Sequence, residues 1–198
     1  MVDFDKLSED KQLAILSAAF SCFGKTGYRK TSVADIATAA GISKASVFQY
    51  FGTKKDLYIY LYQFAIDAIT EKMTVGSEDF FECLDMAAEH KLRVFKKYPG
   101  IFEFLSSTVR EEDEDILLSI QNLNAKEIQD SKAMLFSKVD YGKFKPEADL
   151  KMLFNAITWI NEGYMRATMW QKDVDTMWKE LSAYISILKT GFYKEEYL

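Results

Sequence analysis

Proline and glycine are scarce in this chain, which has two prolines and nine glycines among its 198 residues. Because these residue types end helices and form tight turns, their scarcity predicts long helices and argues against an all-β sandwich. Hydrophobic residues make up 48% of the chain and charged residues 28%, as in a globular protein rather than a disordered one. The sequence shows no internal repeats and no low-complexity linkers.

Cysteine and histidine are also rare. Cys22 and Cys83 lie far apart without CxxC spacing, and their apolar neighbours predict buried free thiols in a cytoplasmic protein. His90 is the single histidine, and the sequence has no nucleophile elbow, which argues against a Ser-His-Asp triad. Gly24-Lys25-Thr26 resembles the end of a phosphate-binding loop, but Ala19 stands where that loop needs glycine. We therefore expect no catalytic residues, no metal ligands and no cofactor.

Long apolar runs are absent: none approaches the roughly 18 residues that a membrane span needs. The mixed, acidic N-terminus does not have the pattern of a signal peptide, so we expect no membrane partner. The net charge is −5, yet residues 1–60 contain eight Lys/Arg and six Asp/Glu, and residues 25–60 contain six and two. A local basic patch on an acidic protein is compatible with binding to DNA phosphates.

Apolar periodicity and capping signals predict an all-α fold of about nine helices. The acidic run 110–115 suits the positive end of a helix dipole and predicts the start of the seventh helix. Pro146 suits the first turn of the eighth. The expected ranges are 8–25, 32–40, 43–51, 53–75, 78–97, 100–109, 110–141, 147–170 and 174–193.

Residues 31–57 have the pattern of two short helices joined by a glycine turn. Ala37 is small where two helices would cross, Gly41 allows positive φ in the turn, and Val47 would fill the angle between the helices. Three separate steric demands are met in register, which predicts a helix-turn-helix. The rest of its small core would consist of Ile36, Ala40, Ile42 and Phe51.

The second of these helices would present small, polar and aromatic side chains outward. Gln49 can pair with an adenine edge, and an alanine or an aromatic ring can touch a thymine methyl. Lys54 and Lys55 begin the next helix, where free N–H groups also favour a phosphate. The alternative is a helical hairpin with an ordinary solvated face. The expected DNA contacts are Thr31, Ser32, Ser43, Lys44, Ala45, Ser46, Phe48, Gln49, Tyr50, Lys54 and Lys55.

On these residues the chain resembles the DNA-binding domain of the TetR family of bacterial transcriptional regulators. Two positions depart from the family pattern: Ala45 stands where glycine is frequent, and Phe48 where tyrosine is frequent. Phe48 therefore lacks a hydroxyl for a phosphate, and its role would be apolar. The matching run is Phe23-Gly24-x2-Gly27-Tyr28-x2-Thr31-x3-Asp35-Ile36-Ala37-x2-Ala40-Gly41-Ile42-Ser43-x4-Phe48-x-Tyr50-Phe51-x2-Lys54-x2-Leu57.

The resemblance implies a helix-turn-helix domain over 1–52, completed by 53–57, and a helical ligand-binding and dimerisation domain over 53–198. It implies a repressor that binds a palindromic double-stranded DNA operator as a homodimer, with reading heads ~34–36 Å apart. The apolar stripes on the last two helices fit the pairing that the family uses. A DNA-binding structural or cell-division factor of the same fold, without an inducer, is the alternative.

The resemblance also implies an effector cavity in the larger domain, for a small hydrophobic or amphipathic molecule. Large apolar side chains are plentiful there, although most would be ordinary core. Polar side chains inside apolar stretches carry more information, because buried polar groups need partners. The candidate effector contacts are Phe64, Phe95, Phe102, Trp159, Glu162, Tyr164 and Arg166.

Overall fold

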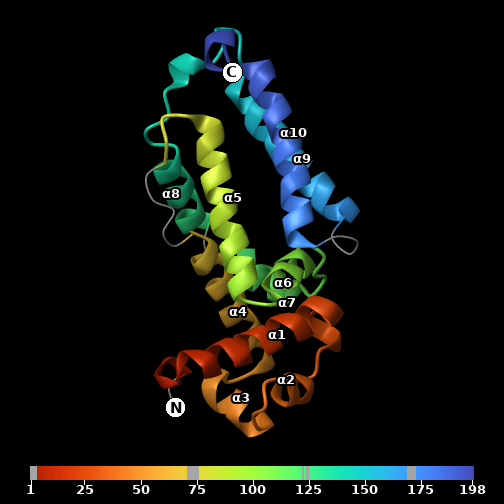
Figure 1. Ribbon diagram of the computed structural model, residues 1–198. Helices are drawn as coiled ribbons and strands as arrows, with labels where there is room; N and C mark the ends of the chain where they lie inside the picture. Colours follow the sequence, from red (N-terminus) through yellow and green to blue (C-terminus); the bar gives the residue numbers. More distant parts are fainter. Residues whose placement is uncertain (1–3, 71–75, 122, 124, 169–172) are drawn as a thin grey trace. The chain divides into compact units, whose positions relative to one another are not determined.

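The computed structural model describes residues 4–70, 76–121, 123, 125–168 and 173–198, and these ranges form an all-α fold (Figure 1), which confirms the predicted class. None of the described helices combines the length and the apolar character that crossing a bilayer requires. The α-helices are α1 (Glu9–Lys30), α2 (Val33–Ala39), α3 (Lys44–Phe51), α4 (Lys54–Thr70), α5 (Phe80–Lys97), α6 (Ile101–Thr108), α7 (Glu114–Gln121), α8 (Ala125–Leu135), α9 (Leu150–Thr168) and α10 (Val174–Phe192).

The described residues thus hold ten α-helices, one more than expected, because the predicted helix 110–141 is wrong. Two helices, α7 and α8, occupy that stretch, and α8 ends at Leu135. Pro146 lies in a turn and not in the first turn of α9. Instead, Asp149 caps α9 by accepting a hydrogen bond of 3.0 Å from the backbone nitrogen of Met152.

Most other helix bounds agree with the sequence patterns within a few residues. Just beyond the predicted end of the first helix, Gly27 has φ 73° and ψ 174°, so regular helix stops there and a separate turn continues to Lys30. The predicted end of the fourth helix, in 71–75, lies outside the described residues.

The chain forms two compact units. The first consists of Met1–Glu71 and Arg93–Gln129, and the second of Lys72–Leu92 and Asp130–Leu198. The sequence placed a boundary after residue 52 instead, and that functional division stays a prediction. Structurally, α4, α6 and α7 share one core with the first three helices, because Leu57, Phe104 and Ile116 are fully buried in it.

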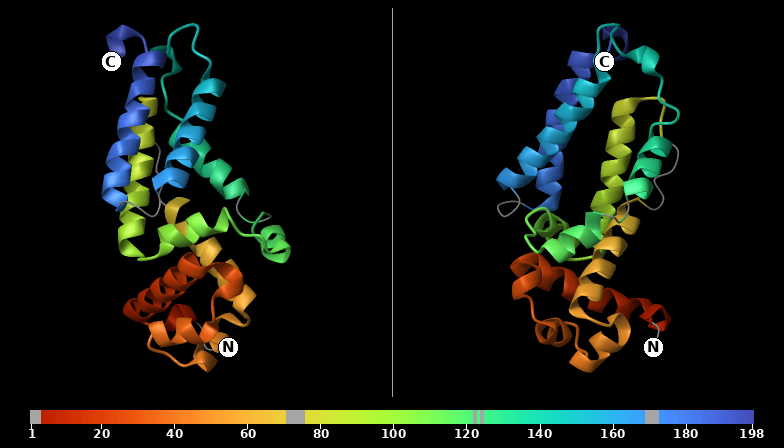
Figure 2. Two further views of the ribbon diagram at one scale, coloured as in Figure 1. Left: turned by 90° about the vertical axis from the view of Figure 1, so that its right-hand side faces the viewer. Right: turned by 180° about the vertical axis from the view of Figure 1, so that it is seen from behind.

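The core of the first unit is strongly aromatic. Tyr58 packs 5.0 Å from Phe23 and 5.0 Å from Phe104 between ring centres, and Phe20 lies 5.3 Å from Phe104. Gly24 lets α1 approach α6 closely, since a Cβ atom there would come within 2.9 Å of the backbone nitrogen of Phe104. The contact between α1 and α6 is visible in Figure 2. This contact between α1 and α6 fixes the position of α1, the helix that precedes the helix-turn-helix in the chain.

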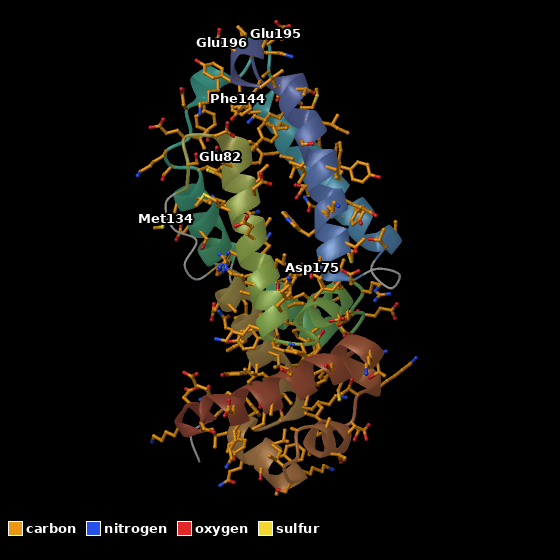
Figure 3. All side chains as sticks on the ribbon, viewed as in Figure 1. Glu82, Met134, Phe144, Asp175, Glu195 and Glu196 are labelled. Carbon is orange, nitrogen blue, oxygen red and sulfur yellow. The ribbon has the colours of Figure 1, made fainter. Side chains whose placement is uncertain are left out.

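In the second unit α9 and α10 lie side by side. Figure 3 shows Phe144 where α5 begins and α10 ends. Its ring lies 5.7 Å from that of Phe80 and 4.8 Å from that of Tyr193. The Tyr193 hydroxyl accepts a 3.0 Å hydrogen bond from the backbone nitrogen of Phe80, and Lys189 pairs with Asp79 at 3.3 Å. These contacts tie the first turn of α5 to the last turn of α10.

Candidate nucleic-acid interface

The segment α2–turn–α3 has the geometry that its sequence predicts. Ala37 and Val47 are buried, with 3% and 2% of their surface exposed. Gly41 has φ 67°, a conformation that costs glycine little and other residues more. The turn is closed by a 3.0 Å hydrogen bond from the backbone nitrogen of Ile42 to the carbonyl oxygen of Ala37. Three features therefore hold the two helices at an angle: the small side chain of Ala37, the positive φ of Gly41 and the buried side chain of Val47.

Side-chain caps begin both helices. Ser32 accepts a 3.1 Å hydrogen bond from the backbone nitrogen of Ala34, and Ser43 accepts one of 3.0 Å from Ser46. The hydroxyls of Ser43 and Ser46 also lie 2.8 Å apart. These caps leave the first backbone N–H groups of α3 oriented along its axis, a favourable position for an anion.

The outward face of α3 carries exposed side chains of the predicted kind. Ser43, Lys44, Ala45 and Gln49 are exposed. Phe48 is 41% exposed although it is large and apolar, and the amino group of Lys44 lies 5.7 Å from the centre of its ring. An apolar ring presented to solvent beside a cation and an amide suits the floor of the DNA major groove, where methyl groups and hydrogen-bonding edges alternate.

Five of the predicted contacts are less accessible: Thr31 is buried, and Ser46, Tyr50, Lys54 and Lys55 are partly buried. Thr31 is 5% exposed, and its hydroxyl donates a 2.7 Å hydrogen bond to the carbonyl oxygen of Gly27. The Thr31 side chain is thus turned into the unit rather than to its surface. Tyr50 is half-buried, with its ring centre 6.1 Å from that of Phe4.

Two lysines begin α4, which follows α3 in the chain. Lys54 donates a 3.2 Å hydrogen bond to the carbonyl oxygen of Arg29 and lies 4.6 Å from the centre of the Tyr28 ring. Partial burial lowers the pKa of Lys54, while the carboxylates of Glu111 and Asp113 oppose that shift. Lys55 extends toward Asp115 and pairs with it at 2.7 Å.

The residues 111–115, here called the acidic segment, were read in the sequence only as a helix start. In the structure they lie against the basic residues of the first unit. Arg29, which the sequence analysis did not select, pairs with Asp113 at 3.4 Å. These partners are 84 and 60 positions apart in the chain, so no local pattern could reveal the pairing of Arg29 with Asp113 or of Lys55 with Asp115.

The candidate effector residues fall into both units. In the first, Phe95 and Phe102 pack with ring centres 5.3 Å apart, and Phe64 packs 5.0 Å from Tyr98. In the second, the Tyr164 hydroxyl donates a 2.6 Å hydrogen bond to a carboxylate oxygen of Glu180.

Two of the remaining candidates do not lie in a core. Trp159 is 68% exposed and Glu162 is also exposed. The Arg166 side chain lies outside the described residues. No group of His, Cys, Asp or Glu in the described ranges is arranged to hold a metal ion.

Comparisons with known proteins give a family match over the segment that contains α2 and α3. The model for "Bacterial regulatory proteins, tetR family" matches residues 15–61. The regulator RutR of Escherichia coli K12 is 34% identical over 91 residues, 45% of this chain and 43% of RutR. The chain thus matches less than half the length of that relative. IcaR of Staphylococcus aureus, a negative transcriptional regulator of a biofilm operon, is 26% identical over 80% of this chain and 84% of its own.

The fold has relatives among solved structures. The complex of triclosan with SmeT, the repressor of a Stenotrophomonas maltophilia multidrug efflux pump, superimposes with a TM-score of 0.66. The two sequences are 15% identical, over 94% of this chain and 93% of the SmeT chain. At this identity the likeness concerns the arrangement of helices alone.

Proposed function

Since the chain belongs to the TetR family of bacterial regulatory proteins, we propose that it is a sequence-specific transcriptional regulator without catalytic activity. More narrowly, we propose a repressor that a small hydrophobic or amphipathic molecule releases from a palindromic operator. Its place of action is then the cytoplasm, where the DNA lies. The observation that carries the proposal is the outward face of α3, where Phe48 is exposed between Lys44 and Gln49.

This face supplies the three kinds of contact that reading a major groove requires. Gln49 offers an amide that pairs with the N6 and N7 atoms of adenine, and Phe48 offers an apolar surface to a thymine methyl. Lys44 and Lys55 offer positive charge to phosphates, which position the protein without reading sequence. The capped start of α3 would direct its backbone N–H groups toward the same DNA phosphates.

Exposed apolar side chains on α9 and α10 support a homodimer. Trp159 on α9 is 68% exposed, and Ile187 on α10 is 64% exposed. Met152, which is 60% exposed, precedes Trp159 by seven positions and therefore lies on the same face of α9. Large apolar groups gathered on helix faces favour burial against a partner. A second copy of the chain would cover them and place two reading heads on the two half-sites of a palindrome.

The most specific part of the proposal is that a small-molecule effector binds the protein. SmeT, which shares the fold, has been solved with triclosan, a small molecule. Each unit by itself offers groups of the kind that bind such molecules: the aromatic pair Phe95–Phe102 in the first unit, and the hydrogen-bonded pair Tyr164–Glu180 in the second. An effector would act by binding the DNA-free conformation more tightly than the DNA-bound one.

The test is a gel shift with DNA from upstream of the chain's own gene, against random DNA of equal length. Addition of triclosan, or of a lipid extract from the host, should release the specific complex and leave random DNA unchanged. Specific binding that neither addition affects would favour the alternative, a structural factor without an inducer. Equal binding to both DNAs would refute sequence-specific regulation.

A further inference from the structure

The acidic segment contacts Lys55, which the proposed function assigns to a DNA phosphate, and the neighbouring basic residue Arg29. Asp115 pairs with Lys55 at 2.7 Å, and Asp113 pairs with Arg29 at 3.4 Å. A carboxylate oxygen of Glu111 accepts a 3.3 Å hydrogen bond from the backbone nitrogen of Tyr28, beside Lys54. The segment thus presents carboxylates to the basic surface at the end of α1 and the start of α4.

The three carboxylates are not equivalent. Glu111 also accepts hydrogen bonds of 3.1 Å from the backbone nitrogens of Glu112 and Asp113, so it shapes the loop. The Asp113 side chain is 23% exposed and also accepts a 3.4 Å bond from the backbone nitrogen of Ile116. The Asp115 side chain is 75% exposed, and its carboxylate contacts Lys55. Glu111 and Asp113 anchor the segment, whereas Asp115 extends from it as an exposed anion.

Packing holds Asp115 in place over Lys55. The next residue, Ile116, is fully buried in the core that contains Leu57 and Leu61 of α4. The carboxylate is therefore carried by a helix, α7, that packs on the same helix as its partner lysine. Because both backbones are fixed, only the two side chains lose conformational freedom when the ion pair forms.

A carboxylate and a DNA phosphate compete for the same ammonium group. The Lys55 side chain is 34% exposed, and its Nζ atom donates to Asp115. For Lys55 to donate to a phosphate, this pair has to open or share its cation. We propose that Asp115 is an internal competitor of the DNA backbone, which keeps Lys55 partly neutralised and weakens the binding of this surface to all DNA sequences alike.

The proposal rests on the proposed function and predicts a specific change in salt dependence. When free Lys55 meets a phosphate, the DNA releases a counterion, which makes binding more salt-dependent. When Lys55 leaves Asp115 for that phosphate, the exposed carboxylate of Asp115 gains a cation from solution. This uptake of a cation offsets the cation that the DNA releases. The wild-type protein should therefore have a shallower salt slope than a variant without the Asp115 charge.

The test compares Asp115→Asn with Glu112→Gln in the full-length chain. Glu112 is exposed and forms no ion pair with the described residues. The substitution Glu112→Gln therefore removes the same charge from the same segment without breaking an ion pair. Asp115→Asn should tighten binding to operator and random DNA by about two- to fivefold. It should also steepen the plot of log affinity against log salt by up to about one. Glu112→Gln should change both quantities much less.

A double-mutant cycle isolates the ion pair. In the background Lys55→Ala, Asp115→Asn and Glu112→Gln should have equal effects, because the competitor has lost its cation. Asp115→Ser serves as a second variant, since serine is also favourable near a helix start, and thermal unfolding checks that each variant folds.

Equal effects of Asp115→Asn and Glu112→Gln with Lys55 present would overturn the proposal and leave only a general charge effect. That result is distinct from a failure of the proposed function. In that failure the wild-type protein would bind operator and random DNA equally, whatever the substitution at Asp115.

Discussion

Thr53 and Asp56 cap the first turn of α4 reciprocally. Asp56 accepts hydrogen bonds from the backbone nitrogen and the hydroxyl of Thr53, at 2.9 and 2.7 Å, and the Thr53 hydroxyl accepts one of 3.1 Å from the backbone nitrogen of Asp56. The spacing Thr53-x-x-Asp56 is similar to that of a capping box. Its position matters because the same turn carries Lys54 and Lys55.

Removal of this cap should destabilise the protein in a pH-dependent way. Asp56→Ala should lower the free energy of unfolding at pH 7 by about 0.5–1.5 kcal/mol, the net contribution of a typical hydrogen bond, because Thr53 loses its acceptor. The hydrogen bonds from Thr53 lower the pKa of Asp56, so its contribution is present above the ordinary aspartate value of about 4. It is lost as the pH falls through the lowered pKa. Urea unfolding at pH 7 and at lower pH should show the gap between wild type and variant closing; a constant gap would contradict this origin.

Gly41 should be sensitive to substitution in a graded order. Its φ of 67° lies in the left-handed region, which asparagine tolerates better than alanine and alanine better than valine. Gly41→Ala should cost about 1–2 kcal/mol, Gly41→Asn less and Gly41→Val more. Since no described atom lies within 4 Å of an added Cβ, a steric clash does not explain the order. Thermal unfolding of the three variants measures it, and equal losses would refute the backbone explanation.

Gln49 should read a base, whereas Lys44 should not. Gln49→Ala should remove about 1–3 kcal/mol of discrimination at one base pair of each half-site. Lys44→Ala should weaken binding to all sequences and reduce the salt slope by about one. Selection of preferred sites from a randomised DNA library distinguishes the two effects. If the Gln49→Ala protein selects the same sites with the same stringency, Gln49 is not a base reader.

Trp159 should belong to the dimer interface. It is 68% exposed in one chain, so Trp159→Glu should shift the protein from dimer to monomer, because a buried unpaired charge is unfavourable. Thr158→Glu is the matched control, since it adds the same charge about 100° around α9. Sedimentation measures the mass of both variants. A dimeric Trp159→Glu protein, or a monomeric Thr158→Glu protein, would argue against this face.

The predictions that the structure confirms rest on interactions between residues that are close together in the sequence. The helix-turn-helix needs Ala37, Gly41 and Val47 at set spacings, and each acts through sterics within one or two turns. The expected helix over 110–141 was wrong for a related reason. Helical propensity there is moderate, and packing on different partners decides where such a helix ends. Ile116 and Ile120 anchor α7 in the core of the first unit, whereas Leu135 of α8 is buried in that of the second.

The amino-acid sequence by itself determined the all-α class, the helix-turn-helix and the outward face of α3, because caps, turns and helical periodicity act over a few residues. Only the tertiary structure decided what surrounds that surface. The hydroxyl of Thr31 is used internally, and Lys55 meets Asp115, 60 positions away in the chain. A charge in the sequence has no partner until the helices pack, and it is packing of α7 on α4 that brings this carboxylate to the lysine.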